Sequence, residues 1–151
     1  MNDTFYGSYY QNESIITEKS KQIIIEPNES NLTHIKEIFI YFTNLSTGNK
    51  ERVLDLLTIL FGDKIQYRYS SLDLDIYQKT TRPEHNSSIP NPQPIYSIGF
   101  SLYPKNNHPS GLVNVSKEHV KFTFDLKSGV RLQNYNTTII FFGYKVFSDD
   151  L

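Results

Sequence analysis

Apolar and polar residues alternate along much of the chain with the period of two that is typical of β-strands. In residues 120–126, Val120, Phe122 and Phe124 alternate with polar residues. Residues 35–42 are apolar in both alternating sets, which predicts a strand that is covered on both faces. Alternation also predicts strands at residues 65–69 and 72–76, a further strand is predicted at residues 95–103, and β-branched or aromatic runs predict strands at residues 22–26 and 137–147.

Residues 51–61 fit two patterns at once. One set of their apolar residues has the spacing of a helical stripe, and another alternates as in a strand that ends at Gly62. Periodicity alone does not choose between the two. We expect a loop or short helix that turns into a strand near residues 56–61.

Segments rich in Pro, Gly and Asn separate the predicted strands, as turn chemistry requires. Residues 79–94 contain four prolines and few apolar residues, so we expect a long loop there. Residues 1–21 are mostly polar apart from an aromatic cluster. We interpret them as an N-terminal arm or linker, which is held down only if its aromatic residues find a partner surface.

Many short strands with little helix are typical of a β-sandwich or barrel. The long and uneven loops favour a jelly roll over a simple meander. We therefore predict an all-β fold, an eight-stranded jelly-roll sandwich with short helical segments in its loops. The predicted domain comprises residues 22–151, after the arm at residues 1–21.

The composition narrows the possible classes of function. The chain has 151 residues, enough for one domain, and a formal net charge of −1. This near-neutral charge argues against direct contact with nucleic acid, which usually needs a dense basic surface. The chain has no cysteine, and none of its apolar runs reaches the roughly 18 residues of a membrane-spanning helix.

The residue types that carry catalysis are scattered. The four histidines, at positions 34, 85, 108 and 119, have no i,i+4 pair of the kind that binds zinc on a helix. Asp73 and Asp75 share one face of a predicted strand, but polar alternation on a solvated face explains them. His85 beside Glu84 is the one other suggestive pair, and we interpret both as solvated loop residues. We expect no enzyme, no cofactor, no metal site and no small-molecule substrate.

One motif has a physical logic of its own. Pro104 and Pro109 cannot donate ladder hydrogen bonds, so they bracket a corner between strands. Gly111 permits a positive φ at that corner. Asn114 and Ser116 can bond to the local backbone and fix the start of the next strand. The motif residues are Phe100, Leu102, Pro104, Pro109, Ser110, Gly111, Asn114, Ser116, Asn134, Tyr135 and Asn136.

In order and spacing, this motif resembles the C-terminal jelly roll of the double-jelly-roll major capsid proteins of large nucleocytoplasmic DNA viruses. The resemblance covers about residues 20–147. Such a capsid subunit has two jelly rolls, whereas 151 residues hold one. The chain is therefore expected to be a fragment, a split-gene product or a single-jelly-roll relative.

The resemblance implies a structural protein of the virion. It implies homotrimeric capsomers that self-assemble with other capsid proteins into an icosahedral shell, near an internal viral membrane. Assembly would take place in the host cytoplasm. No direct contact with nucleic acid is implied.

Other functions remain open on the same fold. One is a scaffold protein of the poxvirus rifampicin-target type, and another is a single-jelly-roll minor or vertex capsid protein. A different class is a carbohydrate-binding jelly-roll module, which needs exposed aromatic residues on a concave sheet. The Tyr-rich strands allow that reading.

Overall fold

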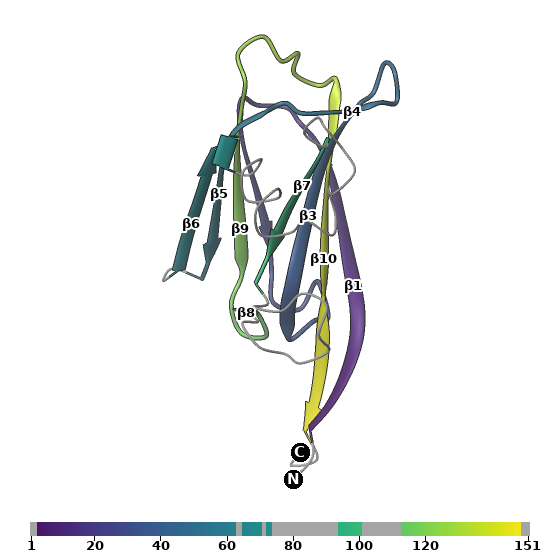
Figure 1. Ribbon diagram of the computed structural model, residues 1–151, viewed down its shortest axis with the longest axis vertical. Coiled ribbons are helices and arrows are strands. Elements are labelled where there is room, and N and C mark those ends of the chain that lie inside the picture. The colour runs from purple at the N-terminus through teal and green to yellow at the C-terminus, as the bar shows by residue number, and fades with distance from the viewer. Residues whose placement is uncertain (1–2, 63–64, 71, 74–93, 101–112, 149–151) are drawn as a thin grey trace.

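The alternating segments pair into two antiparallel sheets that lie face to face (Figure 1). The computed structural model describes residues 3–62, 65–70, 72–73, 94–100 and 113–148. The first sheet contains β1 (Asp3–Ile15), β10 (Tyr135–Ser148), β3 (His34–Asn44), β4 (Lys50–Glu51), β7 (Ile95–Gly99) and β8 (Val113–Asn114). The second sheet has the order β2 (Ser20–Ile25), β9 (Val120–Leu126), β5 (Leu54–Phe61) and β6 (Ile65–Ser70).

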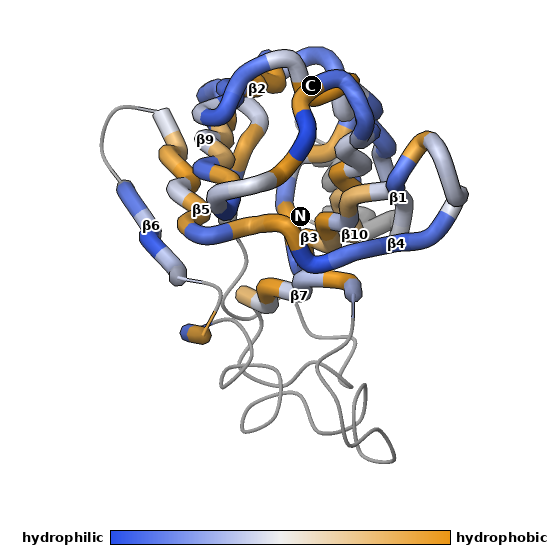
Figure 2. The backbone as a smooth tube through the Cα atoms, turned by 90° about the horizontal axis from the view of Figure 1, so that it is seen from above, coloured by the Kyte–Doolittle hydropathy of each residue, from blue (hydrophilic) through white to orange (hydrophobic). Residues whose placement is uncertain are grey.

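The connections between strands are those of a jelly roll. The chain crosses from one sheet to the other after β1, β2, β4, β6, β8 and β9, so each sheet holds strands that are distant in sequence. Four longer strands, β1, β10, β3 and β7, face another four, and the two-residue strands β4 and β8 flank β3. Viewed along the strands, the two groups lie on opposite sides of the core (Figure 2). The prediction of an all-β, eight-stranded jelly roll is confirmed.

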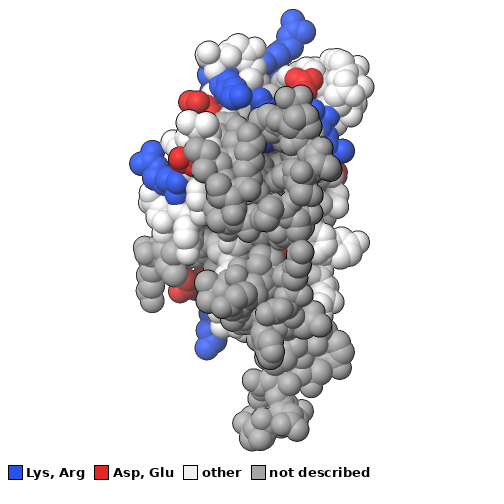
Figure 3. Space-filling model, viewed as in Figure 1, with Lys and Arg blue, Asp and Glu red and all other residues white. Residues whose placement is uncertain are grey.

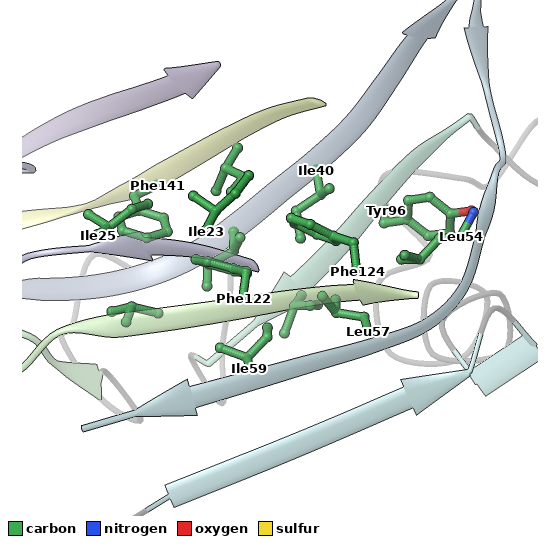
Figure 4. Packing of buried hydrophobic residues seen from close by; sticks show 14 of the residues in the cluster. Ile23, Ile25, Ile40, Leu54, Leu57, Ile59, Tyr96, Phe122, Phe124 and Phe141 are labelled. Carbon is green, nitrogen blue, oxygen red and sulfur yellow. The ribbon is translucent and has the colours of Figure 1, made fainter. Parts of the chain in front are cut away.

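Aromatic side chains fill the space between the sheets (Figure 4). Phe42 on β3 meets Phe124 on β9 edge to face, with 5.5 Å between ring centroids, and both are fully buried. Phe122 packs against Phe141 across the same gap at 5.9 Å. Each buried ring of this size contributes on the order of 2–3 kcal/mol of apolar burial, so these contacts hold the sheets together.

The structure assigns residues 54–61 to a strand and explains why the pattern was ambiguous. The register with β9 shifts between Leu54 and Leu56, so Asp55 is an extra residue in β5. This bulge changes the phase of the alternation, and Leu54 and Leu57 both point into the core. Two inward residues three positions apart mimic a helical stripe. The expected loop is present only at residues 52 and 53, and the strand begins at Leu54, two residues earlier than expected.

The expected N-terminal arm is also corrected, because residues 3–15 form β1. All 13 residues of β1 pair with β10, and the two strands extend together beyond the rest of the sandwich (Figure 1). Two residues of the aromatic cluster supply the partner contacts. Tyr10 packs against Phe141 on the core side, and Tyr9 packs against Phe142 on the outer side.

The strand predicted at residues 72–76 is wrong at its start, where Leu72 and Asp73 have helical backbone. Ser70 N donates to Asp73 Oδ2 at 2.9 Å, and Asp73 N donates to Ser70 Oγ at 3.0 Å. These reciprocal bonds form a capping box, which starts a helical turn. The predicted long loop lies almost entirely outside the described residues, and so does the end of the predicted strand 95–103 after Phe100.

Candidate functional site

Asn134 and Tyr135 join three segments at the end of the sandwich where β4 lies. Asn134 Nδ2 donates to Asn44 Oδ1 at 3.1 Å, and Asn134 Oδ1 accepts from Ser46 Oγ at 2.7 Å. Tyr135 OH donates to Glu51 Oε1 at 2.8 Å, while Asn44 Nδ2 donates to Glu51 Oε2 at 2.9 Å. Burial, followed by the bond to Glu51, raises the pKa of the Tyr135 hydroxyl above its usual value.

This arrangement fixes the start of β10 against the loop that follows β3. The third member of the motif, Asn136, lies one residue further along β10, between Ile15 of β1 and Thr43 of β3. Sequence analysis found Asn134 and Tyr135 but missed their partners Asn44 and Glu51. The partners lie 84 to 90 residues away in sequence, so local patterns carry no signal for them.

Asn114 is the last residue of β8, which lies toward the opposite end of the sandwich (Figure 1), and Ser116 follows two residues later. Asn114 Oδ1 accepts from Ser116 N at 2.9 Å and from Ser116 Oγ at 2.7 Å, which closes a local turn. Val115 N donates to Thr33 O at 2.8 Å and ties this turn to the start of β3. The structure therefore places Asn114 and Ser116 far from Asn134 and Tyr135.

Phe100 packs against the edge of the core. Its ring meets Phe61 at 5.6 Å and Tyr67 at 5.9 Å, and its N–H donates to Lys36 O at 2.8 Å. These contacts make Phe100 a packing residue directly after the C-terminal end of β7. The other motif residues, Leu102, Pro104, Pro109, Ser110 and Gly111, lie outside the described residues.

The titratable groups singled out from the sequence serve local structure. His34 Nδ1 lies 3.0 Å from Thr33 Oγ1, and burial lowers the pKa of its imidazole. The backbone and side-chain bonds from Ser70 lower the pKa of the Asp73 carboxyl. Within the described ranges, acidic and histidine side chains form no group of three that could hold a metal ion. His85, His108 and Asp75 lie outside those ranges.

Among the residues that the structure describes, no helix has the length and apolar character needed to cross a membrane. On the face drawn in Figure 3, the visible Lys and Arg side chains are interspersed with Asp and Glu. The Lys and Arg side chains visible in that view do not form a broad basic surface. This distribution agrees with the near-neutral composition.

The outer side of the first sheet carries a cluster that we call the aromatic face: Tyr9, Phe39, Phe142 and Tyr144, with Lys36 and Glu37. Tyr9 is 65% exposed and Phe142 is 42% exposed. The Phe142 ring meets Phe39 edge to face at 5.4 Å and Tyr9 at 6.1 Å. These residues line a shallow hollow of about 560 Å³. The signal for this face was the second apolar set in residues 35–42, which includes Phe39.

Comparison with known proteins gives matches to solved structures only. No protein-family model and no curated protein sequence matches the chain. The structure of VP54 from PBCV-1, fitted into a cryo-EM reconstruction of the virophage Sputnik, matches with a TM-score of 0.66 and 14% identity. A quasi-atomic model of the PBCV-1 capsid matches with a TM-score of 0.63 and 13% identity.

The matches extend over nearly the whole chain. They cover 96% of it, but only 48% of the VP54 chain and 49% of the chain from the PBCV-1 capsid. The chain thus spans about half the length of the capsid structures that it resembles. The resemblance inferred from the motif is confirmed for the fold: this chain has a jelly roll like that in the capsid structures of the large DNA virus PBCV-1.

Proposed function

We propose that the chain is a structural subunit of a viral capsid. The observation that carries this proposal is the match of the jelly roll, over 96% of the chain, to two capsid structures. The described polar clusters agree with a structural role. Asn134 and Tyr135 tie strand ends together, and Asn114 closes a turn.

In this proposal the chain self-assembles, together with other capsid proteins, into homotrimeric capsomers of an icosahedral shell. The shell belongs to the virion, lies near an internal membrane and forms in the host cytoplasm. A jelly roll suits such a role because its packed sheets are rigid while the loops at its ends are available for contacts with neighbours. The motif around Pro109 and Asn114 is proposed to shape one of these ends.

Electron microscopy of the purified full chain tests this function. Two-dimensional class averages of assembled particles are expected to show three-fold symmetry. A variant carrying Asn134→Ala and Tyr135→Phe loses the bonds to Asn44 and Glu51. We expect it to yield fewer particles than the wild type, because the junction of β10 with β4 is loosened. A wild-type chain that forms no three-fold particles at any concentration or salt condition, while remaining folded by circular dichroism, contradicts the proposal.

The aromatic face supports a second candidate, a carbohydrate-binding module. Exposed rings such as Tyr9 and Phe142 can stack on sugars, and the hollow beside them is open to solvent. Binding of the monomeric chain to a glycan array, abolished by Tyr9→Ala, would favour this candidate over a capsid role.

A further inference from the structure

The tripeptide Asn-x-Ser/Thr is the acceptor sequence for sugars that are linked to asparagine. The chain contains it eight times, at Asn2, Asn12, Asn28, Asn31, Asn44, Asn86, Asn114 and Asn136. Asn2 and Asn86 lie outside the described residues, and the other six lie within them. The structure separates these six by the surroundings of the asparagine amide and of the hydroxyl two residues later.

Transfer of a sugar to asparagine sets geometric conditions for the acceptor. Nδ2 attacks the anomeric carbon of a sugar that is activated by a nucleoside diphosphate. The N–C bond forms while the bond from the anomeric carbon to the diphosphate oxygen breaks. The nucleoside diphosphate leaves with the bonding electrons, and a base of the transferring enzyme accepts the Nδ2 proton. Negative charge spreads onto Oδ1 as this proton leaves, so hydrogen bonds donated to Oδ1 stabilise it.

Asn114 meets these conditions. Its side chain is exposed, and Oδ1 accepts from Ser116 N at 2.9 Å and from Ser116 Oγ at 2.7 Å. No described residue accepts a hydrogen bond from Asn114 Nδ2. Asn114, Ser116, Lys117 and Glu118 line a hollow of about 310 Å³, which leaves room for a sugar beside the amide.

The turn that carries Asn114 is held in place. Asn114 pairs with His34 of β3. Val115 is 3% exposed, and its N–H donates to Thr33 O at 2.8 Å. The acceptor conformation is therefore already formed in the folded chain, and sugar transfer does not have to order it.

Competing hydrogen bonds occupy two of the other acceptors. Asn44 Nδ2 donates to Glu51 Oε2 at 2.9 Å, so this amide is not available. Asn31 Oδ1 accepts from Lys145 Nζ at 2.6 Å. The hydroxyl that belongs to the Asn31 tripeptide is that of Thr33, and it donates to a backbone carbonyl of β10 instead.

Burial hinders the remaining three. Asn12 lies within β1, and its Oδ1 is buried. The Asn28 tripeptide ends at Ser30, which is 7% exposed, and the Asn136 tripeptide ends at Thr138, which is 1% exposed. In each of these tripeptides a group that has to be reached by the transferring enzyme lies inside the protein.

We propose that Asn114 is a modification site, at which the folded chain accepts a sugar on Nδ2 from a nucleoside diphosphate donor. The sugar replaces one hydrogen of Nδ2 and leaves Oδ1 free to accept, so the turn with Ser116 survives the modification. The proposal does not rest on the capsid function, because it uses only the acceptor sequence and the surroundings of each amide.

Incubation of the purified full chain with a soluble N-glycosyltransferase and a nucleoside diphosphate hexose tests the site, and peptide mapping by mass spectrometry gives the readout. Asn114 is expected to gain the hexose at least about tenfold faster than any of the other five described asparagines, because donors placed at a developing charge contribute this much or more. Short peptides that contain the same six tripeptides should show no such preference, because they lack the fold.

Ser116→Ala removes the hydroxyl donor and should slow the modification of Asn114 at least about tenfold, whereas Ser116→Thr keeps the donor and the wild-type rate. Asn28→Gln is the matched control for Asn114→Gln, since both replace an exposed asparagine and only Asn114→Gln should remove the main product. A folded chain that gains no hexose at Asn114 overturns the proposal. So do equal rates at Asn114 and Asn28, a Ser116→Ala variant that is modified as fast as the wild type, or the same preference for Asn114 among the peptides.

Discussion

At the scale of single residues, Gly143 has the tightest steric requirement among the glycines that the structure describes. The register of β10 with β3 shifts between Phe142 and Gly143, and this bulge brings the backbone of β3 close. A Cβ atom at position 143 would collide with the carbonyl oxygen of His34. A backbone atom cannot rotate away as a side chain can, so only glycine fits.

We expect Gly143→Ala to lower the free energy of unfolding by about 1–3 kcal/mol, because overpacking against backbone forces the strands apart. Gly7→Ala is the control, since a Cβ atom there has no neighbour within 4 Å. Its effect should stay within about 0.5 kcal/mol. Urea unfolding at low protein concentration measures both variants, and equal stability of the two would contradict the steric argument.

Tyr135 should give the protein an alkaline pH dependence. Its pKa is raised in the folded protein, mainly by burial and then by the bond to Glu51, so the folded state holds the phenolic proton more tightly than the unfolded state. The resulting stabilisation is fully present below the usual pKa of 10.0 and is lost as the pH rises through the higher folded-state pKa.

Tyr135→Phe is therefore expected to cost about 1 kcal/mol at neutral pH, through the lost hydrogen bond, and to flatten the loss of stability above pH 10. Thermal unfolding across neutral and alkaline pH measures both effects. Tyr67→Phe serves as the control, because it removes a hydroxyl from a half-buried ring on β6. An alkaline profile that Tyr135→Phe leaves unchanged would rule out this role.

At the scale of elements, the sequence pattern predicted most strands but not the full extent of β5 or the existence of β1. Strands with full alternation, such as β9, were predicted at their observed positions. In β5 the bulge at Asp55 changed the period, and this cannot be seen without the partner strand. β1 is an edge strand rich in polar residues such as Gln11 and Asn12, so its pairing depends on β10 rather than on its own pattern.

Deletion of residues 1–15 distinguishes a strand from an arm. Loss of β1 removes the ladder of backbone hydrogen bonds along residues 136–148 of β10 and uncovers the ring of Phe141, which is fully buried. We expect the truncated chain to be insoluble or to lose a cooperative thermal transition. A chain of full length with residues 3–15 in scrambled order should fail in the same way, because register as well as mass is needed. Native-like melting of the truncated chain would restore the interpretation as an arm.

At the scale of the whole molecule, the first sheet of the jelly roll carries the aromatic face on its outer side, whereas β9 of the second sheet carries Lys121, Thr123 and Asp125 on its outer side. The sequence predicted the class of fold because eight strands separated by turns have few stable arrangements. The second apolar set in residues 35–42 also indicated that the outer side of this strand is apolar, which is one part of the aromatic face. The position of Tyr9 beside Phe142 followed only from the pairing of β1 with β10.

Asp3 pairs with Ser148 at the far end of the ribbon that β1 and β10 form. Hydrogen bonds of antiparallel strands lie perpendicular to the strands, so tension between these two residues loads one pair of bonds at a time. A small force that pulls β1 away from β10 at this end would therefore separate the two strands one pair of hydrogen bonds after another. A force applied through the sides of the sandwich would have to break many hydrogen bonds at the same time. In the proposed capsid, the subunit would therefore resist forces applied through the sides of the sandwich far better than forces that pull β1 away from β10.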